Sequence, residues 1–245
     1  MIRGLYTAAS GMMVHLSQQE TIANNLSNSE TTGFKFDLAL QRAAAESEVV
    51  RISSQRRPKI IGTMALQTLT DSIYTNFTEG VNIETGRALD LAITGRGFFA
   101  VQTPQGVRYT RSGAFTLDAE RFLVTEQGHR VLGMQGPLQL PAGDLKVLEG
   151  GQILIDGQFF AQLRLADFAD LQALRKEGAS LWAAEQEELA FTGAVRQGFL
   201  EGSNMQVAEE MSRMITALRL YESNQRVLQA QDQLTGKAVN EIGTL

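Results

Sequence analysis

The chain has no cysteine, which excludes disulfide bonds, thiolate metal sites and cysteine nucleophiles. It has only two histidines, His15 and His129, and neither has a second potential ligand at the spacing of a metal site. No serine lies in a nucleophile-elbow sequence. The glycines of residues 95–97 lead directly into a predicted strand, which favours a tight turn over a phosphate-binding loop. We therefore expect no enzyme activity: no catalytic residue, no metal and no cofactor.

A basic excess and a long apolar run are also missing. The net charge is −5 at pH 7, whereas a nucleic-acid-binding protein usually carries surplus positive charge. The one basic cluster, formed by Arg51, Arg56, Arg57 and Lys59, lacks interleaved aromatic residues, which favours a solvated loop. No apolar stretch approaches the length of a membrane span, and the N-terminal residues do not form a standard secretory signal. We expect no nucleic-acid partner and no membrane span.

Residues 202–245 carry side chains at heptad spacing. One register is formed by Val207, Met214, Tyr221, Leu228, Thr235 and Ile242. The other register is formed by Met211, Leu218, Gln225, Asp232 and Val239. No proline interrupts the segment, and most of its polar members come late. The pattern predicts a long helix with a narrow apolar seam, and such a seam needs a partner helix to cover it.

Residues 4–27 carry a similar pattern. One register contains Leu5, Met12, Gln19 and Leu26, and the other contains Ala9, Leu16 and Ala23. As a helix the segment would be about 35 Å long. Periodicity alone leaves two explanations open: terminal helices that pack on the protein's own core, or a coiled coil built for assembly.

The first helix is expected to end near Asn28, because polar, turn-forming residues accumulate from there to Gly33. Phe34 follows the turn directly and is expected to anchor the new direction of the chain. A helix C-cap followed by core aromatic side chains is the interpretation that the residues favour.

The middle of the chain has a different hydrophobic period. Residues 37–54 permit a short helix with a poorly defined face, and residues 55–69 contain Pro58 and Gly62 and show no clear period. We therefore expect residues 37–71 to be a connecting region with weak local structure. From residue 72 onward, short alternating segments separated by turn residues predict strands, and Asp156-Gly157 is the strongest hairpin signal.

These patterns together predict an α+β protein. Long N- and C-terminal helices flank a middle that forms an all-β domain, and in the second of the two explanations above these helices pair as a coiled coil. The expected divisions are a helical assembly domain of residues 1–36 with 203–245, a connecting region of residues 37–71, and a central β domain of residues 72–202.

Several segments resemble the bacterial flagellar rod and hook proteins, and their motifs follow the order of that family. The N-terminal likeness lies in Ala23-Asn24-Asn25-Leu26-Ser27-Asn28 and Thr32-Gly33-Phe34-Lys35. The central likeness lies in Thr85-Gly86-Arg87-Ala88-Leu89-Asp90-Leu91-Ala92-Ile93 and Tyr109-Thr110-Arg111-Ser112-Gly113-Ala114-Phe115. The C-terminal likeness lies in Leu200-Glu201-Gly202-Ser203-Asn204 and Arg219-Leu220-Tyr221-Glu222-Ser223-Asn224. Arg121 departs from the family pattern, which usually has glycine there, so this turn is expected to differ.

The resemblance implies a structural subunit of the flagellar basal-body rod, the helical tube that crosses the periplasm and transmits torque from the motor to the hook. Such subunits leave the cell through the flagellar type III export apparatus without a cleaved signal peptide. The implied partners are other copies of the chain, other rod and hook axial proteins, and the export apparatus. Residues 99–106 and 136–141 look most like the proximal-rod members of the family, with the distal-rod members close behind.

We expect the terminal helices to form the assembly interface. The residues expected there are Leu5, Met12, Leu16, Ala23, Asn24, Asn25, Leu26, Asn28, Gly33, Phe34, Val207, Met211, Met214, Leu218, Tyr221, Asn224 and Leu228. Polar seam residues such as Gln19 and Gln225 would set the register. An alternative from a different class is a soluble dimeric binding module, with the β domain as reader and the helices as a clamp.

Overall fold

The computed structural model describes residues 2–53, 56–178 and 180–242, which form two compact units. Unit 1 comprises Met1–Leu26, Asp37–Tyr74 and Val207–Leu245. Unit 2 comprises Ser27–Phe36 and Thr75–Gln206. Each unit therefore combines segments that are separated in the sequence, and the segment that follows the first helix belongs to unit 2 rather than to the helical part.

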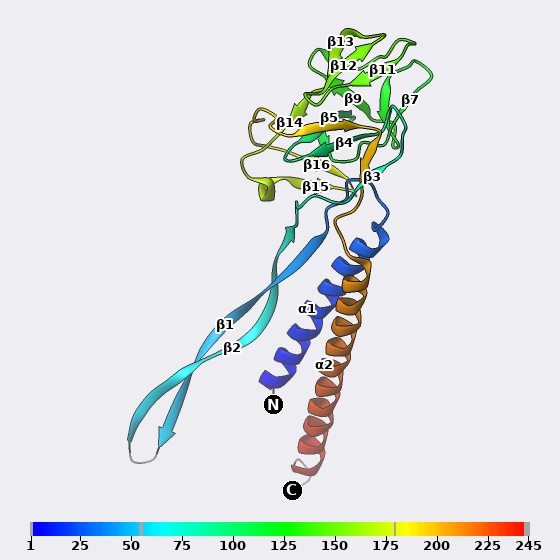
Figure 1. The fold of residues 1–245 in the computed structure, drawn as a ribbon. Helices are drawn as coiled ribbons and strands as arrows, with labels where there is room; N and C mark the ends of the chain where they lie inside the picture. The colour runs from blue at the N-terminus through cyan, green and yellow to red at the C-terminus, as the bar shows by residue number, and fades with distance from the viewer. Residues whose placement is uncertain (1, 54–55, 179, 243–245) are drawn as a thin grey trace. The chain divides into compact units, whose positions relative to one another are not determined.

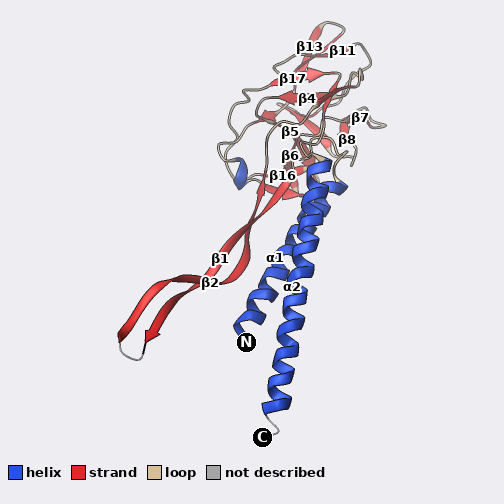
Figure 2. Cartoon of the chain, turned by 60° about the horizontal axis from the view of Figure 1, so that its bottom comes forward, coloured by secondary structure: helices blue, strands red, loops and turns tan. Residues whose placement is uncertain are grey.

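Unit 1 contains both long helices, α1 (Ile2–Ser27) and α2 (Val207–Ile242), which lie side by side in both views (Figures 1 and 2). As predicted, α1 ends next to Asn28, whose carbonyl oxygen accepts a hydrogen bond from the Thr31 N–H at 3.2 Å. Glu209 and Glu210 lie in the first turn of α2, where negative charge stabilises the exposed N–H groups of a helix.

The rest of unit 1 is a long two-stranded sheet of β1 (Asp37–Ser53) and β2 (Arg56–Thr75). The prediction of a connection with weak local structure was therefore wrong, and β2 continues beyond the predicted start of the β domain at residue 72. A two-stranded sheet has no covering layer that would impose an alternating pattern, so its sequence carries little strand signal. The side chains of the basic cluster at Arg51, Arg56, Arg57 and Lys59 lie outside the described residues.

Unit 2 is built from short strands, as the sequence predicted. The largest sheet has the order β15 (Arg175–Glu177), β16 (Leu181–Ala183), β6 (Gly106–Thr110), β5 (Phe98–Thr103), β9 (Arg130–Gly133), β8 (Leu123–Thr125) and β7 (Phe115–Leu117), with β10 (Gly136–Pro137) beside β9 and β14 (Leu165–Ala166) beside β5. A second sheet has the order β11 (Leu145–Val147), β12 (Gln152–Ile155) and β13 (Gln158–Gln162). Two strand pairs complete the unit: β4 (Leu91–Thr94) with β17 (Ala194–Gln197), and β3 (Asn82–Glu84) with β18 (Phe199–Glu201).

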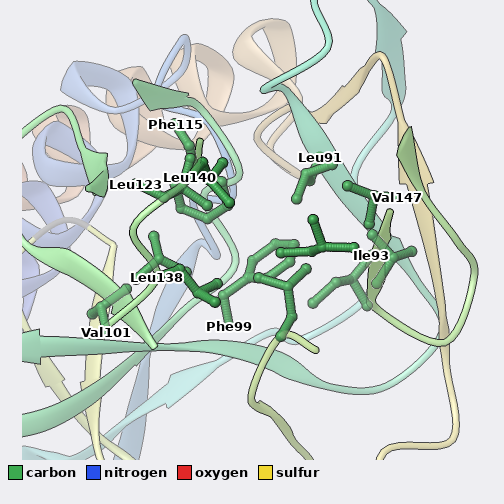
Figure 3. Packing of buried hydrophobic residues seen from close by; sticks show 13 residues of the cluster. Leu91, Ile93, Phe99, Val101, Phe115, Leu123, Leu138, Leu140 and Val147 are labelled. Atoms are coloured by element: carbon green, nitrogen blue, oxygen red, sulfur yellow. The ribbon is translucent and has the colours of Figure 1, made fainter. Parts of the chain in front are cut away.

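Two hydrophobic clusters hold unit 2 together. The larger contains Leu91, Ile93, Phe99, Val101, Phe115, Leu123, Val131, Leu138, Leu140, Val147, Ile153, Leu163 and Val195. Figure 3 shows these side chains directed toward one another. The smaller cluster surrounds Trp182, which is 1% exposed and is the only tryptophan of the chain. Because alternate residues of β5 enter different clusters, this strand is buried on both faces.

Several turns of unit 2 contain residues with positive φ. Asp156 and Gly157 both have positive φ, 52° and 78°, and connect β12 to β13 in the predicted hairpin. A short 3-10 helix, η1 (Leu171–Ala173), lies between β14 and β15. Arg121 also has positive φ, 64°, at the position where the family usually has glycine. Its guanidinium donates to the carbonyl oxygens of Leu140 and Pro141, at 2.8 and 2.7 Å.

Candidate functional site

The terminal helices contact each other in an antiparallel arrangement. A Cβ atom added to Gly11 would lie 2.8 Å from the side-chain amide nitrogen of Asn224. Near the opposite end of the contact, Asn25 Nδ2 donates to Glu210 Oε2 at 3.2 Å. Low residue numbers in α1 thus meet high residue numbers in α2. The missing side chain of Gly11 lets the helices approach closely here.

Shielded positions in α2 repeat every three or four residues on the side that faces α1. Glu210 and Ala217 are buried, and Met214, Tyr221 and Leu228 are half-buried. The last three belong to one predicted register. Asn224, also expected at the interface, is half-buried and lies against Gly11. Glu210 and Ala217 were not predicted, because a glutamate and an alanine do not mark a seam in the sequence.

The second predicted register of α2 does not lie in this contact. Met211 is 53% exposed and Leu218 is 43% exposed, and the buried positions come one residue earlier. Val207, the first member of the other register, is 46% exposed. The side chains of Val239 and Ile242, the last predicted seam positions, lie outside the described residues.

The predicted positions of α1 differ from its buried positions in a similar way. Leu16, Ala23 and Asn24 are exposed, whereas Leu5, Met12 and Leu26 are half-buried. The buried residues of α1 are Ala8, Val14, Thr21, Ile22 and Asn25. Because a helix turns by about 100° per residue, the apolar positions predicted in α1 centre roughly a quarter turn from the side that faces α2.

The exposed predicted residues of α2 are Val207, Met211 and Leu218, which lie about a quarter turn from the side that faces α1. In both helices this turn has the same direction when it is counted with increasing residue number. Since the helices are antiparallel, rotations of the same sense place both sets on one side of the pair. We call this side the apolar face and define it by Leu5, Met12, Leu16, Val207, Met211 and Leu218. The predicted seam residues therefore gather beside the helix contact rather than between the helices.

Asn25 joins three elements of unit 1. Its side chain is completely buried, donates to the Asp37 carbonyl oxygen at 2.8 Å and accepts from the Asp37 N–H at 3.0 Å. It therefore bonds the first residue of β1 as a neighbouring strand would. The donation from Asn25 to Glu210, whose other carboxylate oxygen accepts from Arg213 at 3.1 Å, adds the first turn of α2. Asn28, also predicted as a site residue, accepts from the Thr31 hydroxyl at 3.1 Å in the turn after α1.

Gly33 and Phe34 are internal to unit 2. Gly33 has a φ of 67°, and a Cβ atom there would lie 2.4 Å from the carbonyl carbon of Arg111, so no other residue fits. The Phe34 ring is completely buried, as predicted, and the Lys176 ammonium lies 4.1 Å from its centroid. These two residues fix how the chain leaves α1 and enters unit 2.

Next to Phe34, unit 2 buries a cluster of three charged side chains. The Lys35 ammonium lies 2.5 Å from one Glu201 oxygen, and the Arg111 guanidinium lies 3.3 Å from the other. Exposure of these side chains is 0% for Lys35, 1% for Glu201 and 5% for Arg111. Burial lowers the pKa of Lys35 and of Arg111, and the neighbouring Glu201 carboxylate opposes both shifts. One carboxylate therefore neutralises two buried cations.

Sequence reasoning gave no role to Lys35, Glu201 or Asn204, although all three lie in the recognised motifs. Asn204 accepts from the Phe36 N–H at 3.0 Å and donates to the Asn76 carbonyl oxygen at 2.8 Å. It thus joins the segment after α1 to the segment after β2. The motifs signalled importance, but nothing in a linear sequence pairs residue 35 with residue 201.

No group of three or more potential ligands could hold a metal ion among the described residues. His15 Nδ1 instead forms a hydrogen bond of 2.9 Å with the Gln18 side-chain oxygen, within one turn of α1. Over the same part of the chain, neither α1 nor α2 is long and apolar enough to cross a membrane.

Three family models match the segments that build these sites. The model described as "Flagella basal body rod protein" matches residues 5–35. The "Flagellar hook protein FlgE/F/G D1 domain" matches residues 92–160, and the "Flagellar basal body rod FlgEFG protein C-terminal" matches residues 196–241. The matches therefore cover most of α1, the middle of unit 2 and nearly all of α2.

Similar proteins match over the whole length. The flagellar basal-body rod protein FlgG of Bacillus subtilis (strain 168) is 33% identical over 98% of this chain and 99% of its own length. FlgG of Borreliella burgdorferi is 34% identical over 98% of both chains. The flagellar basal-body rod protein FlgF of Caulobacter vibrioides is 32% identical over 100% of both chains. These relatives are structural proteins of the basal body rather than enzymes, and the chain belongs to the flagellar basal-body rod protein family.

Proposed function

We propose that this chain polymerises through its terminal helices into the helical rod that transmits torque from the flagellar motor to the hook. The observation that carries the proposal is the exposed apolar surface of α2. Its members are Val207, Met211, Ile215, Leu218, Leu220, Val227 and Leu234, each between 43% and 54% exposed. They lie on more than one side of the helix, whereas α1 covers only one side. A helix with this pattern is suited to burial among several neighbours.

The exposed surface continues on α1. Tyr6 is 59% exposed, Met13 is 73% exposed and Leu16 is 46% exposed. Complete burial of one large apolar side chain contributes about 1.5–3 kcal/mol. Several such side chains per contact would offset the translational and rotational entropy that association costs. The isolated chain thus carries a strong drive to associate.

The sheet of β1 and β2 supports the same proposal. Its strands are 17 and 20 residues long, and a two-stranded sheet is only marginally stable without a covering layer. Its outer strand edges offer N–H and C=O groups to a neighbouring chain. We propose that neighbouring subunits cover this sheet in the rod.

The finer assignments rest on the family resemblance. In the rod, the terminal helices pair as a coiled coil with those of other subunits, and the predicted interface residues on the apolar face take part. The subunit reaches the rod through the flagellar export apparatus without a cleaved signal, and its neighbours are other axial proteins. Proximal-rod position is our preferred assignment, supported by residues 99–106 and 136–141. Relatives named FlgF and FlgG match at similar identity, so a distal-rod position is the alternative.

A concentration series tests the proposal. Sedimentation velocity measures mass, and circular dichroism at 222 nm measures helix content. We expect mass to rise well beyond a dimer as concentration increases, with helix content rising or constant, and isolated basal bodies to seed this growth. A stable dimer that never grows, with or without seeds, would instead support the soluble binding module. A monomer that ignores the seeds would refute assembly through the helices.

A further inference from the structure

Unit 2 exposes three large apolar side chains that line one groove. Met134 is 69% exposed, Phe159 is 64% exposed and Phe160 is 43% exposed. The groove has a volume of about 530 Å³ and lies between β13 and the turn that joins β9 to β10. Successive side chains of a regular strand point to opposite faces, but the register of β12 and β13 shifts so that Phe160 has no partner residue. This β-bulge allows both phenylalanine rings to line the same groove.

The groove continues past Phe160 into two smaller cavities, of about 290 and 260 Å³. Phe160 and Gln139 line both the first and the second cavity. Arg121 and Leu140 line both the second and the third. The three cavities therefore form one elongated surface, which suits an extended chain better than a compact small molecule. We call this surface the linked groove.

Arg121 supplies positive charge in the middle of the linked groove. Its Nε and Nη2 atoms donate to the carbonyl oxygens of Leu140 and Pro141, which uses one edge of the guanidinium and leaves Nη1 and the second Nη2 hydrogen for another acceptor. No carboxylate among the described residues lies within ion-pair distance of Arg121. The other charged residue of the lining, Asp144, belongs to the third cavity alone. The linked groove thus offers a site for a carboxylate on the side of Phe160.

The backbone of β13 adds a second means of binding. β13 is the last strand of its sheet, and at one end of the groove its Gln162 carbonyl oxygen accepts from the Met134 N–H at 3.0 Å. Before that contact, at residues 158–161, the outer edge of β13 has no partner strand in the described part of the chain. A free strand edge beside cavities for side chains is the arrangement that binds extended peptides by strand addition.

We infer that the linked groove binds an extended peptide segment of another protein through an apolar side chain and a carboxylate. The apolar side chain packs against the rings of Phe159 and Phe160, and the carboxylate binds Arg121. Side chains on one face of a strand are about 7 Å apart, so the two are expected two residues apart in the peptide. The inference goes beyond the proposed assembly and does not depend on it, because every lining residue belongs to unit 2 rather than to the terminal helices.

A neutral glycan is the competing occupant, because aromatic rings and glutamine side chains also bind sugars. Such a ligand would use the phenylalanine rings but would gain little from the charge of Arg121 or from the strand edge. The unpaired charge and the free edge of β13 therefore favour the peptide.

Three variants separate the features of the linked groove. Phe159→Ser with Phe160→Ser removes the apolar surface, and Arg121→Gln removes the charge. Arg121→Lys keeps the charge but loses the planar guanidinium, so it separates the charge from the bonds that this side chain makes within unit 2. The matched control is Arg196→Gln, which removes an exposed cation of unit 2 that lines none of the three cavities. Urea unfolding followed by Trp182 fluorescence confirms that each variant is folded.

The probe is a library of random peptides displayed on phage, selected on the immobilised full-length chain and counter-selected on the double serine variant. We expect the enriched peptides to carry Asp or Glu two residues from an apolar residue. Fluorescence anisotropy then measures the binding of one labelled synthetic peptide and of its Asn or Gln analogue. Loss of the peptide carboxylate and Arg121→Gln should each weaken binding about tenfold, and the two together should weaken it little further. Arg121→Lys should retain part of the preference for the acidic peptide, and Arg196→Gln should bind as the parent does.

Three results would overturn the inference. The first is the absence of any peptide that prefers the parent over the double serine variant. The second is a set of enriched peptides without the acidic residue, or binding that is equal for the parent and Arg121→Gln. The third is binding of N-acetylglucosamine oligomers that needs the phenylalanines but not Arg121, because the groove would then be a glycan site. None of these results bears on assembly through the helices, so the proposed function is tested separately.

Discussion

The buried cluster of Lys35, Glu201 and Arg111 makes a strong prediction for the variant Glu201→Gln. The substitution preserves the shape of the side chain but removes the carboxylate that pairs with both buried cations. Breaking a buried ion pair by removing one partner costs about 3–5 kcal/mol. Glu201 Oε1 also accepts from the Gly80 N–H at 3.0 Å, so the segment after β2 loses an acceptor if the amide turns. Since whole domains are stable by about 5–15 kcal/mol, the loss is a large fraction of the stability of unit 2.

The assay is urea unfolding followed by the fluorescence of Trp182, which is the only tryptophan and lies in the core of unit 2. The comparison variant Lys35→Met leaves Glu201 paired with Arg111 and should cost less than Glu201→Gln. The control Glu120→Gln removes an exposed pair with Arg130 in unit 2, where the carboxylate is 67% exposed, and should cost about 0–1 kcal/mol. If Glu201→Gln were no more costly than this control, the cluster would not stabilise unit 2.

The pH dependence gives a second check with a definite sign. Burial already lowers the pKa of Lys35 below its ordinary value of 10.5, and Glu201 opposes this shift. Without the carboxylate the folded-state pKa falls further, while the unfolded-state value stays near 10.5. Between these two values the unfolded chain binds more protons, so the free energy of unfolding rises with pH. The free energy of unfolding that Glu201→Gln loses relative to the parent should therefore become smaller as pH rises toward 10.5. A loss that grows over this range would contradict the argument.

Three further predictions concern other contacts. Asn25→Ala should destabilise the helices by about 1–3 kcal/mol for each buried group left unsatisfied. Asn25→Asp should cost more at neutral pH, because it places a carboxylate beside Glu210. Urea unfolding followed by circular dichroism at 222 nm measures both. Gly11→Ala should be tolerated, because its Cβ meets only the flexible end of Asn224, whereas Gly11→Leu should cost about 1–3 kcal/mol by forcing the helices apart in the same assay. Arg121→Gly should be about 1 kcal/mol more stable than Arg121→Ala, because both lose the guanidinium bonds but only glycine adopts the positive φ freely; equal melting temperatures would contradict this.

The sequence predicted those parts of the fold that local chemistry determines. The polar segment after α1 marked the end of that helix, and Asp156-Gly157 marked the hairpin between β12 and β13. The strands of unit 2 were predicted because their apolar segments are short and separated by turn residues, although β4 and β5 are buried on both faces. The sheet of β1 and β2 was missed because its sequence shows no clear period, and a sheet of only two strands has no second sheet packed on it that would require one.

The helix contact could not be predicted from apolar residues alone. In α1 the side that faces α2 includes Gly4 and Gly11, whose missing side chains leave room for Gln231 and Asn224. A search for apolar heptads ignores such a surface, so it selected the stripe one quarter turn away. The role of the apolar face in contacts between subunits remains a prediction.

The structure separates two kinds of residue that the motifs combine. Asn25, Gly33 and Phe34 are buried within single units, where they fix how the chain enters and leaves each unit. Met211 and Leu218 contribute little to the isolated chain, because half or nearly half of each side chain remains exposed. A residue of the first kind acts on folding, whereas a residue of the second kind acts only where a neighbour supplies the missing contact. Substitutions in the two sets should therefore fail differently: the first by loss of folded protein, the second by a folded subunit that no longer joins the rod.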